Sequence, residues 1–379
     1  MFEFATAGRI IFGRGTLKEL APAAVTFGKR AVVVTGRSAE RAGPVLELLK
    51  RAGVEASTFS ISGEPSISAV QDGVAKAREF GAGFVIGFGG GSAIDAAKAI
   101  AALLTNPGDI FNYLEVIGRA QPLKQTPLPC IAIPTTAGTG AEVTRNAVLL
   151  SPGHRVKVSL RHPMMLPRLA IVDPALTDSL PPAVTASTGL DALTQLIEPY
   201  VCARANPLTD SVCIEGMKRA RSLRRAYAND PAGREEMCVA SLFGGLALAN
   251  AGLGAVHGFA APIGGMFDAP HGAVCAAVLP HAMEINLRAL RQRGPAGIAR
   301  RFEDVARVLT DNPQARAEDG IAWVTKLCRD LEIPGLRTCG ITEPHVDELC
   351  DKASVSSSMK ANPVRLTEAE LRELLMRAL

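Results

Sequence analysis

The first half of the chain alternates short apolar, β-branched runs with segments of helical period, and no other feature constrains its fold as strongly. The run Ala31–Thr35 is typical of a strand that is buried on both faces. Strands separated by helices of this length predict a parallel, doubly wound sheet. The predicted strands are 31–35, 54–59, 84–86, 131–134 and 169–172, and the predicted helices are 40–52, 70–80 and a segment after Ser92.

The second half has a different texture, which begins after Leu180-Pro181-Pro182. Strand-like runs almost vanish there, and Ala/Leu-rich stretches at helical period replace them, such as 184–201 and 235–256. The second of these stretches carries many small residues, as tightly packed buried helices do. We therefore expect an α/β dinucleotide-binding domain at 1–180 and an all-α domain at 181–379.

Charge and cysteine usage exclude several classes of protein. The formal net charge is only +4, and the densest basic stretch, 218–225, is short enough to be one solvated helix face, so nucleic acid is not an expected partner. Eight cysteines are scattered without a CxxC pair, which favours reduced thiols in a cytoplasmic protein. The N-terminus lacks the pattern of a signal peptide. The most apolar stretch, 84–104, contains Asp95 and Lys98, so a membrane span is not expected.

A glycine-rich loop leads from a predicted strand directly into a predicted helix, with the sequence Gly87-Phe88-Gly89-Gly90-Gly91-Ser92. Glycines let a phosphate approach the backbone amides, and a helix N-terminus offers unpaired N–H groups. A structural interpretation is also open, in which Ser92 is the N-cap and Asp95 closes a capping box. Both can hold together, since three consecutive glycines exceed what a cap requires. The loop predicts phosphate binding.

The turn after the first buried strand bears on the choice of nucleotide. In a dinucleotide site such a strand ends near the adenine ribose, where a carboxylate would bind the 2′-hydroxyl and repel a 2′-phosphate. The turn here is Thr35-Gly36-Arg37-Ser38 and has no carboxylate. Arg37 and Ser38 are suited to hold a phosphate instead. The turn therefore favours NADP over NAD.

Polar residues in the apolar second half form a candidate metal site. Asp191 and Gln195 lie one turn apart on a predicted helix, and His257 and His271 follow fourteen residues apart in an almost wholly apolar segment. Asp and His are suitable ligands for Zn²⁺ or Fe²⁺. A single histidine in an apolar stretch is more often a hydrogen-bonded core residue, and that alternative stays open for each of them.

Several motifs together resemble those of the iron-containing (group III) alcohol dehydrogenase family. Residues 89–98 are similar to its GGGSxxDxxK signature, and residues 133–144 to its IPTTxGTGSE segment. The stretch 189–200 and the pairs His257-Gly258 and His271-Gly272 resemble its metal-binding segments. The opening residues 9–15 and the late Asn362-Pro363 also fit, so the resemblance spans nearly the whole chain.

The resemblance implies a Rossmann-like N-terminal domain and an all-α C-terminal domain, the architecture shared with dehydroquinate synthase, with a cleft between them. It also implies a homodimer. The expected catalytic residues are Asp191, His257 and His271. The expected metal ligands, for Fe²⁺ or Zn²⁺, are these three together with Gln195. The expected NAD(P)-binding residues are Gly36, Arg37, Ser38, Gly89, Gly90, Gly91, Ser92, Asp95, Thr135, Thr136, Thr139 and Lys157.

Two positions depart from the family pattern. Members with four metal ligands carry His where this chain has Gln195, whose amide oxygen is a weaker, neutral ligand. Members often carry another His, linked to proton relay, where this chain has Ala261. Related glycerol dehydrogenases bind their metal with one Asp and two His, so three ligands suffice. Pro199 cannot donate to the carbonyl of Gln195, which favours a kink beside the site.

The resulting hypothesis is a metal-assisted NAD(P)-dependent alcohol dehydrogenase or aldehyde reductase, with reversible hydride transfer to a small alcohol or carbonyl substrate. Three alternatives remain open at this point. They are a metal-independent reductase similar to maleylacetate reductases, an NAD-using cyclising lyase, and a non-catalytic cofactor-binding protein. The sequence does not identify the substrate, and Asn146, Phe259 and Phe267 are only candidates for the pocket wall.

Overall fold

The computed structural model describes residues 1–379, including every side chain except that of Ala296. The chain divides into two compact units. The first, here called the α/β unit, comprises residues 5–136 and 140–179. The second, here called the helical unit, comprises residues 180–379 together with 1–4 and 137–139.

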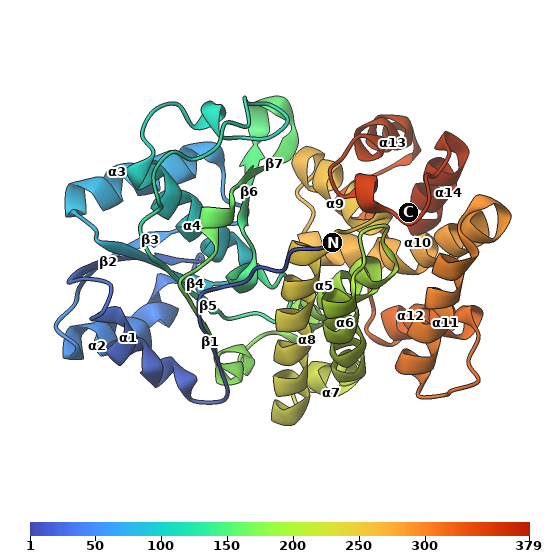
Figure 1. Ribbon diagram of the computed structural model, residues 1–379, viewed down its shortest axis with the longest axis horizontal. Coiled ribbons are helices and arrows are strands. Elements are labelled where there is room, and N and C mark those ends of the chain that lie inside the picture. The colour runs from blue at the N-terminus through green and yellow to red at the C-terminus, as the bar shows by residue number, and fades with distance from the viewer. The chain divides into compact units, whose positions relative to one another are not determined.

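A parallel sheet forms the centre of the α/β unit (Figure 1). Its six described strands lie in the order β1-β8-β5-β4-β2-β3. Five of them correspond to predicted strands, and the edge strand β1 was not predicted because it is only three residues long. The strands are β1 Ile10–Phe12, β2 Arg30–Thr35, β3 Glu55–Ser60, β4 Phe84–Gly89, β5 Cys130–Pro134 and β8 Leu169–Val172.

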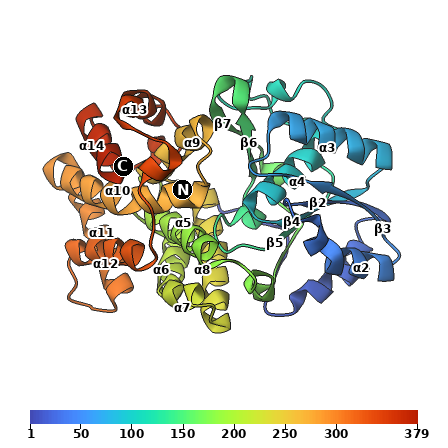
Figure 2. The same ribbon diagram turned by 180° about the vertical axis from the view of Figure 1, so that it is seen from behind.

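Helices cover both faces of this sheet, as Figure 2 shows from behind. Alternate side chains of a buried strand enter different cores, because successive residues of a strand point to opposite faces. Val33 packs in the core beside α1 and α2, whereas Val32 and Val34 pack in the core beside α3 and α4. The predicted doubly wound α/β fold is therefore confirmed. These helices are α1 Leu20–Ala24, α2 Gly43–Arg51, α3 Ile67–Phe80 and α4 Gly91–Thr105.

An antiparallel hairpin was missed by the sequence patterns. It consists of β6 (Asn146–Ser151) and β7 (Val156–Arg161), paired along their whole length. Leu149 and Leu160 bury their side chains in the core beside α3 and α4. Residues of β6 alternate between buried and half-buried, so the hairpin lacks the continuous apolar run of the central strands.

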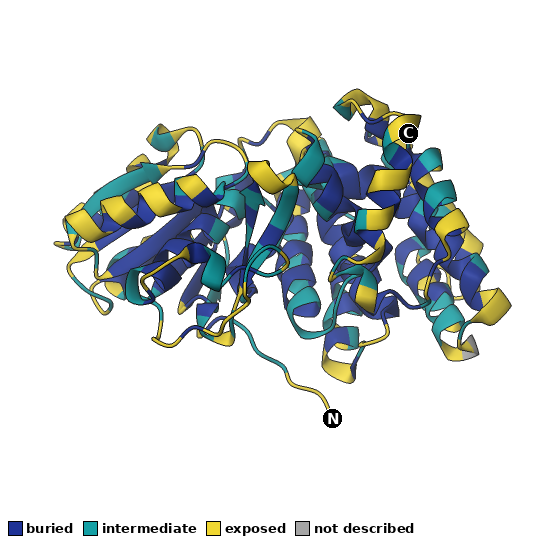
Figure 3. Cartoon of the chain, turned by 90° about the horizontal axis from the view of Figure 1, so that it is seen from above, coloured by how far each residue is buried: buried dark blue, intermediate teal, exposed yellow. Residues whose placement is uncertain are grey.

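Among the described residues of the helical unit, the regular elements are α-helices and short 3₁₀ helices. Helix α5 packs against α6, α8 and α10. Figure 3 shows some helices that are mostly buried and others that carry exposed residues along one side. All but a few residues of α5 after its first turn are buried. The helices are α5 Pro182–Val201, α6 Pro207–Ala220, α7 Leu223–Tyr227, α8 Pro231–Asn250, α9 Ala255–Met266, α10 His271–Arg293, α11 Ala296–Thr310, α12 Ala317–Asp330, α13 Val346–Ser354 and α14 Glu368–Ala378.

The prediction of one helix over 235–256 was wrong, because α8 ends at Asn250 and α9 begins at Ala255 after a bend of 95°. The new helix start is fixed by distant side chains. The Asn362 side-chain oxygen accepts the N–H of Ala255 at 3.0 Å, and the Glu198 carboxylate accepts the N–H of Val256 at 2.7 Å. Across the described residues, no single helix has the length and apolar composition of a membrane span. The bent pair α8–α9 taken together is long and apolar enough, but length and composition are the only support for a span there.

Candidate metal centre

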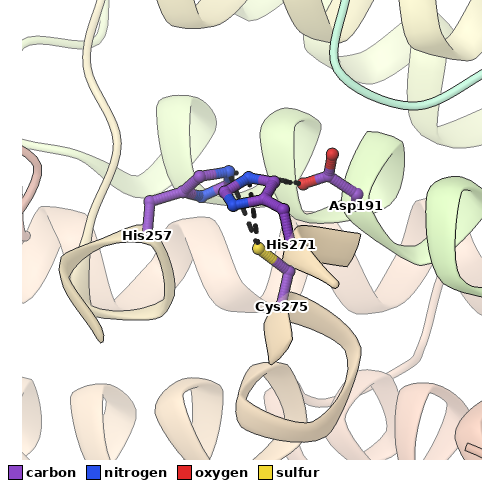
Figure 4. A group of neighbouring side chains, drawn as sticks. All are labelled: Asp191, His257, His271 and Cys275. Carbon is purple, nitrogen blue, oxygen red and sulfur yellow. Dashed lines mark hydrogen bonds and ion pairs between the residues drawn. The ribbon is translucent and has the colours of Figure 1, made fainter. Parts of the chain in front are cut away.

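Four side chains of the helical unit converge on one point (Figure 4). They are Asp191 on α5, His257 on α9, and His271 and Cys275 on α10. One ligand atom from each of them lies within 4.8 Å of the others. Three of the four are sequence-predicted ligands. Cys275 was not predicted, although its position one turn after His271 places both on the same face of a helix.

Close packing of two helices explains the His-Gly pair at 271–272. His271 is the first residue of α10, and α10 packs against α5. A Cβ atom at Gly272 would lie only 2.7 Å from the carbonyl oxygen of Ser187 on α5. Glycine at this position therefore lets the start of α10 approach α5 closely enough for His271 to reach Asp191.

The carboxylate of Asp191 faces both imidazoles. Its Oδ1 lies 3.4 Å from Nε2 of His257 and 3.6 Å from Nε2 of His271. Among the described side chains, this oxygen is one of three buried polar atoms without a hydrogen-bond partner. Neighbouring ligands of a tetrahedral ion with bonds of about 2.0–2.1 Å are about 3.3 Å apart. The donor types, their spacing and the carboxylate oxygen that lacks a hydrogen bond all fit a divalent metal.

Gln195 contributes a second unpaired buried acceptor. Its Oε1 has no hydrogen-bond partner in the described structure, and the residue lies one turn after Asp191 on α5. Its amide group also takes part in a hydrogen bond that lowers the pKa of Asp191. Pro199 lies inside α5, which continues to Val201. Ala261 lies on α9 and brings no proton-transfer group.

Glu198 supports the cluster and was missed by the sequence analysis. Nδ1 of His257 lies 2.7 Å from Oε2 of Glu198, so the imidazole donates there and leaves Nε2 directed toward Asp191. Metal-binding histidines are commonly oriented by such a carboxylate. The available signal was spacing, because Glu198 follows Asp191 by seven residues and so lies on the same face of the helix.

The electrostatics of the cluster favour a cation. Burial opposes ionisation of Asp191, but the charges of His271 and His257 outweigh it and lower its pKa. Burial also opposes protonation of His257, but Cys275, Asp191 and Glu198 raise its pKa well above the usual range. The pKa of His271 is raised against burial by Cys275 and Asp191. The site therefore attracts positive charge, which a proton or a metal can supply.

A second candidate site lies at the carboxyl edge of the sheet in the α/β unit. The chain leaves β2 toward β3 and returns to β4 on the other side of β2, which makes the β2/β4 boundary a topological switch point. Ligands of doubly wound sheets bind at such points. The predicted residues at or just after the ends of β2, β4 and β5 lie there together, namely Gly36, Arg37, Ser38, Gly89, Gly90, Gly91, Ser92, Thr135 and Thr136.

The glycine loop is shaped by close contacts. Gly89 has φ of +155°, and a Cβ atom there would lie 2.8 Å from Cβ of Ala93. The carbonyl of Gly89 accepts the N–H of Thr135 at 2.8 Å, which holds the β4 and β5 loops together. At Gly90 a Cβ atom would meet only Thr136, at 3.5 Å. Packing within the protein therefore does not require a glycine at position 90.

The predicted capping box at α4 was wrong. The N-cap is Gly90, no side chain caps the helix, and α4 begins at Gly91. Asp95 instead forms an ion pair with the buried Lys98 at 2.9 Å and accepts the N–H of Val148 at 2.9 Å. Tertiary contacts thus take the carboxylate away from the helix start. The first amides of α4 are left without a side-chain cap, which suits an anion.

The other predicted positions have separate surroundings. Thr139 belongs to the helical unit by its contacts. Lys157 lies on β7, where its ammonium forms an ion pair with Glu64 at 2.8 Å. Of the candidate pocket residues, Phe259 is fully buried, Phe267 packs against the ring of His345, and Asn146 begins β6. Full burial makes Phe259 part of the core and not a pocket wall.

Comparison with known sequences gives matches along almost the whole chain. The profile of the family described as "Iron-containing alcohol dehydrogenase" matches residues 7–174. A second profile, "Fe-containing alcohol dehydrogenase family, C-terminal", matches residues 185–379. A 1,3-propanediol dehydrogenase of Klebsiella pneumoniae is 34% identical, over 100% of this chain and 99% of that protein.

Solved structures give the same result. A crystal structure of 1,3-propanediol oxidoreductase matches with a TM-score of 0.93 at 32% identity, covering 100% of both chains. A sulfoacetaldehyde reductase from Bifidobacterium kashiwanohense, solved in complex with NAD+, matches with a TM-score of 0.86 at 28% identity, over 99% of this chain and 98% of that one.

Proposed function

The chain belongs to the iron-containing alcohol dehydrogenase family, and from that premise we propose a catalytic centre in which Asp191, His257 and His271 hold a divalent metal. The protein is an oxidoreductase that acts on CH–OH donors, and its relatives support this activity and none of the three alternatives. The observation that carries the metal assignment is the buried Oδ1 of Asp191, which has no hydrogen-bond partner and faces two imidazole nitrogens.

The residues around the metal position would orient the substrate oxygen. A bound divalent ion supplies Lewis acidity toward that oxygen. Glu198 fixes the tautomer of His257, and Asp191 contributes the negative charge that retains a cation. The His271 side chain is 30% exposed whereas that of Asp191 is 2% exposed, so substrate reaches the centre from the His271 side. With Ala261 on α9, water or a ribose hydroxyl has to carry the proton to solvent.

The nicotinamide dinucleotide is bound at the carboxyl edge of the sheet in this proposal. The uncapped amides of α4 and the glycines 89–91 receive the pyrophosphate, helped by Ser92. Thr135 and Thr136 line the nicotinamide end, and the family resemblance adds Thr139 and Lys157. Asp95 acts indirectly, since its ion pair with Lys98 ties α4 to the fold.

NADP is the preferred form of the cofactor in this proposal. Family members use a nicotinamide dinucleotide, and the reductase from Bifidobacterium kashiwanohense was solved with NAD+. Here the turn after β2 consists of Gly36, Arg37 and Ser38 and has no carboxylate. The side chains of Arg37 and Ser38 are both exposed. Arg37 is anchored by a hydrogen bond from its Nε to Oγ of Ser62 at 3.3 Å, which leaves its terminal nitrogens for a 2′-phosphate.

We also infer a small-molecule substrate and a reducing setting for the enzyme. A small alcohol or aldehyde is the substrate, as the names of the relatives suggest. The structure joins none of the described cysteines in a disulfide, which supports a reducing, cytoplasmic setting. A homodimer is implied by the family resemblance.

Metal analysis combined with an activity assay tests the proposal. We expect one divalent metal per chain, NADPH-linked reduction of small aldehydes, and loss of that activity on chelation with recovery on metal addition. Asp191→Asn, which keeps the size of the side chain, should lose the metal, while the exposed control Glu284→Gln should retain it. Full activity after exhaustive metal removal would contradict the proposed centre.

A further inference from the structure

We propose that Cys275 is a fourth protein ligand of the metal, as a thiolate, and that it makes the centre select zinc over iron. This inference rests on the metal centre proposed above. Family members with four ligands carry His at the position of Gln195, so this chain lacks one imidazole. The structure brings a different donor to the same cluster, from another helix.

The position of the sulfur fits a ligand. Sγ of Cys275 lies 3.9 Å from Nε2 of His257 and 3.7 Å from Nε2 of His271. With Zn–S bonds of about 2.3 Å and Zn–N bonds of about 2.0–2.1 Å, sulfur and nitrogen ligands of a tetrahedral ion lie about 3.6 Å apart. Figure 4 shows the sulfur of Cys275 directed at the two imidazole rings.

Helix α10 and a hydrogen bond from His257 position the donors around the sulfur. Cys275 is fully buried on α10, one turn after His271, so both donors are held by one helix. His257 is fixed from its other side by Glu198. The thiol is therefore shielded from solvent. Its polar neighbours are the two imidazoles that would share the metal with it.

The chemistry of binding is a proton exchange without electron transfer. The S–H bond breaks as the metal–sulfur bond forms, and the proton leaves to solvent. Thiolate is a soft ligand, and mixed sulfur and nitrogen sets are typical of zinc, whereas oxygen and imidazole sets also suit Fe²⁺. A thiolate in place of an imidazole therefore shifts the preference toward Zn²⁺, and toward Co²⁺ as its spectroscopic substitute.

X-ray absorption of the zinc-loaded full-length protein tests the sulfur directly. We expect one sulfur neighbour at about 2.3 Å together with nitrogen and oxygen neighbours at about 2.0–2.1 Å. The cobalt-loaded protein should show sulfur-to-cobalt charge-transfer absorption in the near ultraviolet. Cys275→Ser should abolish that absorption and lower zinc affinity by at least the roughly 10- to 100-fold that loss of a supporting contact costs.

Cys328→Ser is the matched control. Sγ of Cys328 donates to the carbonyl of Ala276 at 3.5 Å, so this thiol also packs against α10 but does not belong to the donor cluster. This variant should keep the cobalt absorption. Loading with equal Zn²⁺ and Fe²⁺ under anaerobic conditions should give zinc protein for the wild type, and Cys275→Ser should bind a larger share of iron, because the remaining carboxylate and imidazole ligands discriminate less between the two metals.

The outcomes separate this inference from the proposed function. Bound metal with only nitrogen and oxygen neighbours, or an unchanged cobalt spectrum in Cys275→Ser, would overturn the role of Cys275 and leave the Asp191, His257 and His271 centre intact. A protein that binds neither zinc, iron nor cobalt would overturn both. The absorption measurement on the wild type holds even if a variant fails to fold.

Discussion

Oε2 of Glu198 lies 2.7 Å from Nδ1 of His257, while Oε1 of the same carboxylate accepts the N–H of Val256 at 2.7 Å. One side chain on α5 therefore both starts helix α9 and orients a candidate ligand on it. The contact decides which nitrogen of His257 faces the Asp191 carboxylate. The orientation of His257 in the centre therefore depends on Glu198.

Replacing Glu198 should weaken metal binding without removing any ligand. Glu198→Ala is expected to lower metal affinity by roughly 10- to 100-fold, because His257 loses the acceptor that fixes its tautomer. Competition with a chromogenic chelator measures the affinity. Glu284→Ala is the control, since that carboxylate pairs with Arg377 at the surface. Equal metal affinity in Glu198→Ala and wild type would remove Glu198 from the centre.

Gly90→Ala should weaken cofactor binding while the fold survives. The added methyl group meets only Thr136, at an ordinary contact distance of 3.5 Å, but it occupies the space where the pyrophosphate is proposed to lie. We expect the dissociation constant for NADPH, followed by fluorescence, to rise about tenfold or more, as for loss of a charge-assisted hydrogen bond. Gly43→Ala, with open space at its Cβ position, should bind normally. Unchanged affinity in Gly90→Ala would place the phosphates elsewhere.

Arg37→Ala should discriminate between the two nicotinamide cofactors. Removal of a guanidinium that contacts the 2′-phosphate is expected to cost about 1.5–3 kcal/mol for NADPH and little for NADH. The ratio of kcat/KM with NADPH to kcat/KM with NADH should therefore fall at least about tenfold. Arg51→Ala, at an exposed ion pair with Glu47, serves as the control. A ratio that stays constant would contradict the proposed preference for NADP.

Glu142→Gln should change the pH dependence of stability. Burial raises the pKa of Glu142 to about 7, against the opposing effects of its backbone hydrogen bond and the Lys98 charge. The folded state therefore favours the protonated carboxyl, and this contribution to stability is lost as pH rises through about 7. Relative to wild type, Glu142→Gln should gain about 2–3 kcal/mol between pH 5 and pH 8.

Denaturant unfolding at both pH values checks this expectation. Glu47→Gln, at an exposed carboxylate, should show no such gain. A difference between Glu142→Gln and wild type that is the same at pH 5 and pH 8 would show that Glu142 has an ordinary pKa in the folded protein.

Local sequence patterns determined the doubly wound sheet and the glycine loop. The strand Ala31–Thr35 was identifiable because a strand buried on both faces must be apolar along its length, whatever surrounds it. The loop at 89–91 was identifiable because glycine alone permits the positive φ and the contact with Ala93 found at Gly89. Asp191, His257 and His271 attracted notice because polar side chains are costly in apolar helices unless they have partners.

Only the tertiary structure decided which partners those residues have. Cys275 resembles any buried cysteine in the sequence, and the cluster appears only when α5, α9 and α10 meet. The break between α8 and α9 depends on Asn362, which is 107 residues away from Ala255 in the chain. Asp95 was expected to cap its own helix, but Lys98 and the hairpin strand β6 compete for its carboxylate. Sequence patterns report the periodicity of each element, whereas contacts between elements distant in the chain follow from packing, which no local pattern encodes.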